Sequence, residues 1–166
     1  MDEASDLASY TRDAHRFYHP SFRNYMEKFG YSDIILIEAE DGKVVYSVEK
    51  RPEYGTSLKE GPFKESSLGK LFQSIIESPE RGKALIADYK VYQPAFNEPV
   101  GFAGAPVYEG EELIGVAVFQ LALKSLNDIM SKRDGMGDSG ETYIVGADHL
   151  MRSDSLDAEN LFPVEN

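Results

Sequence analysis

Residues 30–50 decide the fold, and they read GYSDIILIEAEDGKVVYSVEK. Two apolar runs, residues 33–39 and 43–49, are separated by the turn Glu40-Asp41-Gly42. An Asp-Gly pair between runs rich in β-branched residues is the strongest short-range signal of a β-hairpin. The stretch therefore predicts two antiparallel strands close to the start of the chain.

A helix is expected before this hairpin. From residue 3 to about residue 28, apolar residues recur at three- and four-residue spacing, which is the pattern of an amphipathic helix. Pro20 falls inside this pattern, and we expect it to kink or restart the helix and to move His19 out of the helical region. Gly30 is a natural C-terminal stop.

The rest of the chain alternates strand and helix patterns. After a loop over residues 50–62, the pattern predicts a helix over 64–77, a strand over 84–89, a second loop with Pro94 and Pro99, strands over 100–108 and 112–121, a helix over 124–133 and a strand over 142–147. This order is typical of an α+β domain, in which helices cover one antiparallel sheet.

The composition excludes several classes of partner and site. The chain has 166 residues with 17 basic and 29 acidic side chains, so its net charge is −12 and we expect no nucleic-acid partner. It has no cysteine, which excludes disulfides, thiol nucleophiles and thiolate metal sites. No apolar run approaches the ~18 residues of a membrane span. We expect an excised soluble piece of a longer protein, with any membrane anchors outside both of its ends.

Two short motifs suggest a cofactor or metal, but their contexts argue against both. Residues 135–140, GMGDSG, match the dinucleotide fingerprint, yet here a helix is expected before the motif and a strand after it, the reverse of the required order. His15 and His19 have the spacing of metal ligands on a helix, but Pro20 interrupts that helix. No G-x-S-x-G nucleophile elbow is present. We predict no cofactor, no metal site and no enzymatic activity.

Candidate ligand-binding residues lie where the predicted strands meet loops. Tyr46 and Tyr92 each combine a ring that packs with a hydroxyl that bonds. Packing at the core edge is the better explanation of any single tyrosine, whereas the two together favour a pocket. Gln120 and Asp88 fall within apolar strands, where a buried polar group needs a partner. Lys50 is placed to pair with a carboxylate, or to protect a strand end.

An ordered series of motifs resembles the extracytoplasmic Cache (PAS-like) sensor domains of bacterial methyl-accepting chemotaxis proteins. Besides the hairpin, it includes His19-Pro20, Tyr54-Gly55-Thr56, GFAGAP over 101–106, GVAVFQ over 115–120, NDIM over 127–130, GDSGETYIVG over 137–146 and Met151-Arg152-Ser153. The resemblance implies a long N-terminal helix packed on a PAS-like antiparallel sheet of five to six strands with short covering helices. A ligand would lie on one sheet face, beneath loops 50–62 and 90–99.

The resemblance also implies a function and an organisation. Residues 1–30 would form a dimerisation and signalling helix, 31–155 the sensor domain, and 156–166 an extension toward a membrane-proximal segment. We expect a periplasmic homodimer that binds a small molecule, such as a carboxylate. The pocket residues would be Tyr46, Lys50, Asp88, Tyr92, Phe102 and Gln120, and replacement of Lys50 by Ala would abolish binding of a carboxylate.

Other functions remain open at this stage. The same kind of module occurs on histidine kinases and on nucleotide or cyclic-dinucleotide cyclases. A cytoplasmic PAS domain holding flavin or haem and a ligand-free dimerisation module are further alternatives. The arginine-containing amino-acid motif of double-Cache receptors is not recognisable, so the resemblance does not imply amino-acid specificity.

Overall fold

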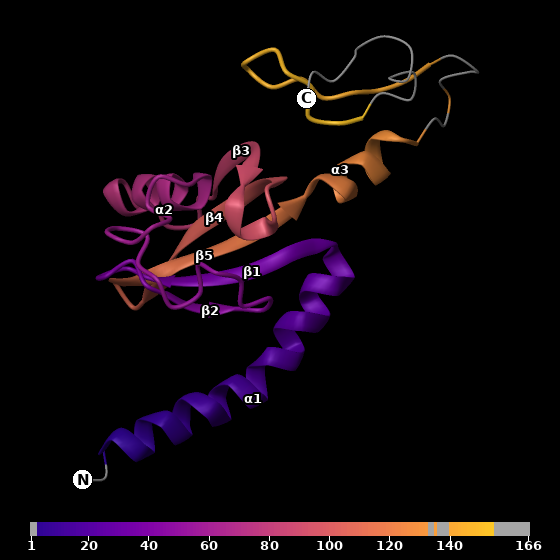
Figure 1. Ribbon diagram of the computed structural model, residues 1–166. Helices are drawn as coiled ribbons and strands as arrows, with labels where there is room; N and C mark the ends of the chain where they lie inside the picture. Colours follow the sequence, from indigo (N-terminus) through magenta and orange to yellow (C-terminus); the bar gives the residue numbers. More distant parts are fainter. Residues whose placement is uncertain (1–2, 133–134, 136–139, 155–166) are drawn as a thin grey trace.

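The computed structural model describes residues 3–132, 135 and 140–154, with side chains from residue 15 onward. The elements, in chain order (Figure 1), are α1 (Glu3–Phe29), β1 (Tyr31–Glu38), β2 (Val44–Ser47), α2 (Ser67–Glu77), β3 (Leu85–Tyr92), the 3-10 turn η1 (Gln93–Ala95), β4 (Glu98–Glu109), β5 (Glu112–Ala122) and α3 (Leu123–Met130). Most of the 135–140 motif and the predicted 156–166 extension lie outside the described residues.

The strands form a five-stranded sheet in the order β2-β1-β5-β4-β3, and every neighbouring pair is antiparallel. Helices α1 and α2 lie on opposite faces of this sheet (Figure 1). The architecture confirms the α+β fold with a long N-terminal helix.

Successive side chains of β1 point to opposite faces of the sheet, so this strand contributes buried residues to both faces. Ile35 and Ile37 are buried with α2 in the main core, whereas Ile34 is buried with Met26 of α1 on the other face. Helix α2 begins at a Ser66 cap, whose hydroxyl accepts a hydrogen bond from the Gly69 amide at 3.1 Å. Both helices therefore pack through residues that the apolar pattern selects.

The predicted break at Pro20 is wrong in one respect. Helix α1 is continuous from Glu3 to Phe29, so His19 keeps a helical conformation instead of leaving it. Figure 1 shows that the axis of α1 bends along its length. A bend is the usual way in which a helix accommodates an internal proline, because it relieves the clash of the ring with the preceding turn.

The predicted strand over 142–147 is also wrong. Among the described residues this segment makes one isolated bridge, between Val145 and Met151. The amide of Gly146 donates to the Leu150 carbonyl at 2.9 Å, and that of Arg152 to the Ile144 carbonyl at 2.7 Å. The segment therefore pairs with its own continuation rather than joining the sheet. Strand β3, in contrast, continues to Tyr92, three residues past its predicted end at residue 89.

Candidate functional site

Four polar side chains are buried together on the α2 face of the sheet. Asp33, Glu53 and Gln120 have 0% of their surface exposed, and Tyr92 has 1%. We call these four residues the polar cluster. They come from β1, from the loop over residues 48–62 (the covering loop), from β5 and from the end of β3, so only the tertiary fold brings them together.

The sheet register sets the arrangement of the cluster. Gln120 of β5 pairs with Asp33 of β1 on one side and with Phe102 of β4 on the other. Paired residues of antiparallel strands share a face, so these three side chains point the same way. The Tyr92 ring meets the Phe102 ring edge-on, with centroids 5.0 Å apart.

Both oxygens of the Asp33 carboxylate accept hydrogen bonds from the protein itself. Its Oδ1 accepts hydrogen bonds from the amides of Ile34 (2.7 Å), Val48 (2.9 Å) and Glu49 (3.3 Å). Its Oδ2 accepts one from the Ser47 hydroxyl at 2.8 Å. Burial raises the pKa of Asp33, whereas these hydrogen bonds lower it. The carboxylate fastens the start of the covering loop to β1, which is a structural role.

The other three members of the cluster have unsatisfied polar atoms. Both carboxylate oxygens of Glu53, the Tyr92 hydroxyl and both polar atoms of the Gln120 amide have no hydrogen-bond partner among the described residues. An unpaired buried polar group costs about 1–3 kcal/mol. Five such atoms in one place need an explanation, and a partner from outside the chain supplies one.

The electrostatics of Glu53 and Tyr92 are coupled. Burial raises the pKa of the Glu53 carboxyl. Burial also raises the pKa of Tyr92, and the charge of nearby Glu53 raises it further. No hydrogen bond of acceptable geometry joins the two groups in this arrangement, although they are close enough for each to alter the pKa of the other. The interior of the site therefore disfavours an uncompensated negative charge.

A cavity of about 200 Å³ lies beside Gln120. Ser32, Arg51, Glu98 and Lys124 line it together with Gln120. Arg51 is half-buried, and its positive charge lowers the pKa values of both Glu53 and Tyr92. Because pockets for drug-sized ligands measure about 300–1,000 Å³, this volume suits a small metabolite.

The structure brings together three of the six residues expected to line a pocket, namely Tyr92, Phe102 and Gln120. Tyr46 points to the opposite face, where its hydroxyl lies 2.9 Å from Nδ1 of His19 on α1. Lys50 is exposed on that side of the domain, and its charge helps to lower the His19 pKa, which burial lowers most.

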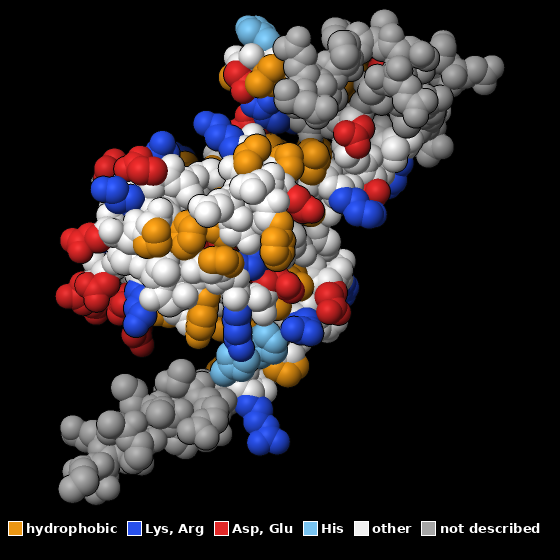
Figure 2. Space-filling view, viewed as in Figure 1, with side chains coloured by type: hydrophobic (Ala, Val, Ile, Leu, Met, Phe, Trp, Pro, Cys, Tyr) orange, Lys and Arg blue, Asp and Glu red, His pale blue; other side chains and the backbone are white. Residues whose placement is uncertain are grey.

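The side chains around Tyr46 form a small basic patch. His15, His19, Arg23 and Lys50 make up this patch, and the two imidazole rings are stacked with centroids 4.5 Å apart. Figure 2 shows histidines next to Lys and Arg side chains where α1 meets the body of the domain. Within the part of the chain that the structure describes, no group of three or more His, Asp or Glu side chains could hold a metal ion.

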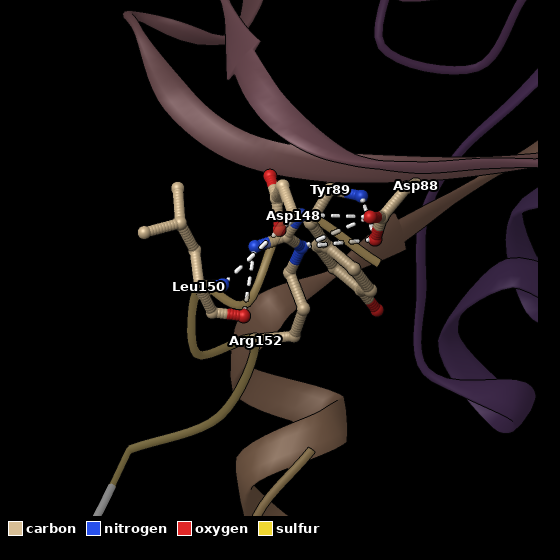
Figure 3. Close-up of polar contacts among 5 residues, drawn as sticks. All are labelled: Asp88, Tyr89, Asp148, Leu150 and Arg152. Carbon is tan, nitrogen blue, oxygen red and sulfur yellow. Dashed lines mark hydrogen bonds and ion pairs between the residues drawn. The ribbon is translucent and has the colours of Figure 1, made fainter. Parts of the chain in front are cut away.

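Asp88 is not buried, contrary to the expectation from its apolar strand. It lies on the edge strand β3 with 46% of its side chain exposed. Nε of Arg152 donates to Oδ1 of Asp88 at 3.0 Å, and Nη2 donates to its Oδ2 at 2.8 Å. Figure 3 shows this guanidinium between the carboxylates of Asp88 and Asp148, and its hydrogen bonds lower the pKa of Asp88.

Sequence reasoning missed Glu53, and of the adjacent cations Lys50 and Arg51 it chose Lys50. Glu53 and Arg51 lie in a stretch of turn-forming residues, where a charged side chain is normally solvated. The covering loop instead folds back over the sheet, with Leu58 completely buried and the Leu58 amide bonded to the Gly42 carbonyl at 2.8 Å. Leu58 was the one local signal that this loop has an inner side.

Comparison with known proteins gives a match at the level of structure. No family model matches the chain, and no curated protein sequence does. The ligand-binding domain of the Campylobacter jejuni chemoreceptor Tlp3, in complex with 4-methylisoleucine, superposes with a TM-score of 0.60 at 12% identity, covering 99% of this chain and 67% of that one. The chain has the fold of a Cache sensor domain.

Two further Cache-like structures cover a smaller share. The ligand-binding domain of Pseudomonas fluorescens chemoreceptor CtaA with L-serine has a TM-score of 0.52 at 18% identity, over 77% of this chain and 49% of that one. The V. cholerae histidine kinase DctB sensor domain has a TM-score of 0.53 at 15% identity, over 78% and 44%. The chain thus spans about half of these two structures. None of the described helices is long and apolar enough to cross a membrane.

Proposed function

We propose that this chain is the extracytoplasmic ligand-sensing domain of a bacterial transmembrane chemoreceptor. Its ligand would occupy the site formed by Glu53, Tyr92, Phe102 and Gln120 beneath the covering loop. The observation that carries the proposal is the set of five unpartnered buried polar atoms of Glu53, Tyr92 and Gln120, the last of which also lines a cavity. Solved domains of the same fold support it, because those of CtaA, Tlp3 and the Pseudomonas aeruginosa PAO1 receptor PctC hold L-serine, 4-methylisoleucine and GABA.

A ligand at this site would contact the elements that hold α3 and the segment over residues 140–154. A bound molecule would bridge the covering loop, β3 and β5, and β5 ends at Ala122 directly before α3. Strand β3 also carries Asp88, which holds the segment over residues 140–154 through Arg152. A ligand that contacts these elements differently in two arrangements would shift the population between them.

A homodimer through α1 forms part of the proposal. Among the described side chains of α1, from residue 15 onward, four aromatic ones are exposed, namely Phe17 (76%), Tyr18 (57%), Tyr25 (45%) and Phe29 (54%). Tyr18 and Tyr25 line an apolar groove of about 350 Å³ between α1 and the sheet, together with Phe22, Ile34 and Phe119. Clustered exposed apolar side chains of this kind mark interaction surfaces. Residues 1–30 would then carry dimerisation and signalling, 31–155 sensing, and 156–166 the connection to a membrane-proximal segment.

The sensor domain of a histidine kinase is a second candidate, which the similarity to DctB favours. Both candidates use the same ligand site and differ only in the output domain. Ligand-dependent methylation of the full-length receptor would support the chemoreceptor. Ligand-dependent autophosphorylation would support the kinase.

Thermal unfolding of the purified domain against small carboxylates, amino acids, amines and purines tests the proposal. A ligand at 100 times its Kd adds about 2.7 kcal/mol to the unfolding free energy, which is a shift of several degrees for this size. The shift should saturate and should disappear in a Glu53→Gln/Gln120→Leu double variant, but persist in the surface variant Glu49→Gln. If no compound of the panel shifts the unfolding temperature, a ligand-free dimerisation module would be favoured instead.

A further inference from the structure

Two residues that the sequence placed in the ligand pocket, Tyr46 and Lys50, belong to a different group of polar side chains. They lie on the α1 face of the sheet, together with His15, His19 and Arg23 of the basic patch. All five side chains carry N–H or O–H donors, or gain one by protonation. The proposed ligand site uses none of them, so the patch needs an explanation of its own.

The charges of the basic patch are not balanced within the described part of the chain. Arg23 and Lys50 form no ion pair with any residue there. Burial lowers the pKa of His19 most. The charges that lower it further are those of His15, Arg23 and Lys50, whereas the charge of Glu49 raises it. An anion can therefore approach this junction, although the net charge of the chain is −12.

The two imidazole rings of the patch lie on one side of α1, because the helix continues through Pro20. Nδ1 of His19 lies 2.9 Å from the Tyr46 hydroxyl, and this contact leaves Nε2 of the ring for another partner. Nε2 of His15 is buried and has no partner among the described residues. A protonated imidazole donates at both of its nitrogens. The pair therefore gains donors and positive charge together on mild acidification.

The backbone of Lys50 is held in place by the sheet. Its φ of 50° lies in the left-handed region, which a lysine seldom adopts. The Lys50 amide donates to the Ser47 hydroxyl at 2.7 Å, and that hydroxyl donates to the Asp33 carboxylate at 2.8 Å. Glu53 follows three residues later in the same covering loop. A molecule bound to Lys50 would therefore also act on the loop that covers the proposed ligand site.

We propose that the basic patch is a second binding site, which takes a small oxyanion with a carboxylate, sulfate or phosphate group. Lys50, Arg23 and the protonated His19 ring would donate to its oxygens, and such charge-assisted hydrogen bonds are stronger than neutral ones. The bound anion would tie α1 to the covering loop on the face of the sheet opposite to Glu53. A divalent metal ion at the two histidines is a less suitable occupant, because Arg23 and Lys50 would repel it.

NMR titration of the whole chain tests the proposal. The probes are sulfate, inorganic phosphate and succinate at constant ionic strength, with glycerol as the neutral control. At least one anion should produce saturable changes in the resonances of His15, His19 and Lys50. Sulfate keeps its charge between pH 7.5 and pH 6, so its affinity should rise at least about threefold over this interval as the imidazoles take up protons. Bound sulfate should in turn raise the pKa of His19.

Variants locate the anion. Arg23→Gln and Lys50→Gln should each weaken sulfate binding at least about threefold, and the two together at least about tenfold. Lys64→Gln is the matched control, because Lys64 is exposed outside the patch and its replacement changes the net charge equally. The Glu53→Gln/Gln120→Leu double variant should bind sulfate as the wild type does, because it alters only the proposed ligand site. Unchanged unfolding midpoints would show that the patch variants remain folded.

The possible failures are distinguishable. No saturable change with any of the three anions, or equal affinity in Lys50→Gln and Lys64→Gln, would overturn the anion site and leave the sensing function to its own test. Binding that is lost in the Glu53→Gln/Gln120→Leu double variant but kept in Lys50→Gln would assign the anion to the proposed ligand site instead. Saturable binding of Zn²⁺ without binding of any anion would overturn the proposal in favour of a metal site at the two histidines.

Discussion

Arg152 binds Asp88 through two parallel hydrogen bonds, of 3.0 and 2.8 Å, although 64 residues separate them in the sequence. The same guanidinium contacts Asp148 at 2.7 Å, within its own loop. A second link joins α3 to the same segment, because the side-chain Oδ1 of Asn127 accepts a hydrogen bond from the Asp154 amide at 2.9 Å. The segment over residues 140–154 is thus attached to the edge strand whose other end carries Tyr92.

Replacing Asp88 with Asn should loosen this attachment. The variant loses the charge and one acceptor of the bidentate pair, so amide exchange over residues 140–154 should accelerate by about tenfold, while exchange in β1 and β5 is unchanged. Hydrogen-exchange mass spectrometry measures both. Asp128→Asn is the control, because it breaks an exposed i,i+4 pair with Lys124 that contributes little. Equal exchange in Asp88→Asn and the wild type would contradict the prediction.

The same attachment should depend on pH only under strongly acidic conditions. Hydrogen bonds from Arg152 lower the pKa of Asp88 below its ordinary value of 3.8. A carboxyl whose pKa is lowered by folding contributes stability that is present above the ordinary value and lost as the pH falls through the lowered one. Protection of residues 140–154 should therefore persist at pH 5 and fall below about pH 3.8. Loss of protection already at pH 5 would show that another group controls the segment.

Removing the Asp33 carboxylate should destabilise the whole domain. Asp33→Ala leaves the buried Ile34 amide and the Ser47 hydroxyl without their acceptor, at a cost of about 2 kcal/mol or more. The Val48 amide loses one of its two acceptors and keeps the Ile34 carbonyl at 3.2 Å. Asp33→Asn keeps one oxygen for the amides and should lose much less. Urea unfolding compares the two, and similar losses would mean that charge rather than hydrogen bonding is decisive.

Unliganded Glu53 should make the domain more stable on mild acidification. Folding raises its pKa above the ordinary 4.5, so the folded state binds a proton at pH values where the unfolded state does not. Its contribution is full below the ordinary value and is lost as the pH rises through the raised one. The unfolding free energy of the wild type relative to Glu53→Gln should therefore rise between pH 8 and pH 5. Parallel curves for the two proteins would contradict the raised pKa.

Apolar replacement of the unsatisfied site residues should stabilise the unliganded domain. Gln120→Leu removes a buried amide without partners and should gain about 1 kcal/mol. That gain corresponds to a rise of about 2–4 °C in Tm for a domain of this size. Gln73→Leu is the matched control, because the Gln73 amide donates to the Leu58 and Lys64 carbonyls at 3.3 and 3.0 Å and should lose stability instead. A loss of stability in Gln120→Leu would show that the amide has a partner within the folded protein.

Charge introduced on α1 should dissociate the proposed homodimer. Phe17 is 76% exposed on α1, so Phe17→Glu should leave the fold intact and shift the mass in light scattering from dimer to monomer. Ile86→Glu is the control, since Ile86 is 75% exposed on β3 and lies outside the proposed interface. A dimer that survives the α1 variant but not the β3 variant would place the interface on the sheet edge.

The sequence alone determined the elements whose formation depends on local pattern. The Asp-Gly turn and the alternation of Ile35 and Ile37 defined the hairpin, and the apolar stripe of Leu68, Leu71, Phe72 and Ile75 defined α2. These signals are strong because each buried face repeats with the period of its own backbone. The apolar pattern of residues 142–147 wrongly predicted a strand of the sheet, because the backbone of this segment pairs locally and Tyr143 and Val145 remain exposed.

Only the tertiary structure decided the candidate site. Phe102 and Gln120 could be anticipated, since each falls within a predicted strand, and so could Tyr92, whose ring and hydroxyl suit a site where a strand meets a loop. Glu53 and Arg51 could not, because the conformation of a loop depends on what it packs against and not on a period in its own sequence. The Asp33 carboxylate is satisfied by hydrogen bonds and the Glu53 carboxylate is not. This difference likewise depends on hydrogen bonds between residues distant in the chain. The sequence thus determined which segments form strands and helices, and the fold determined which charged side chain is left to meet a ligand.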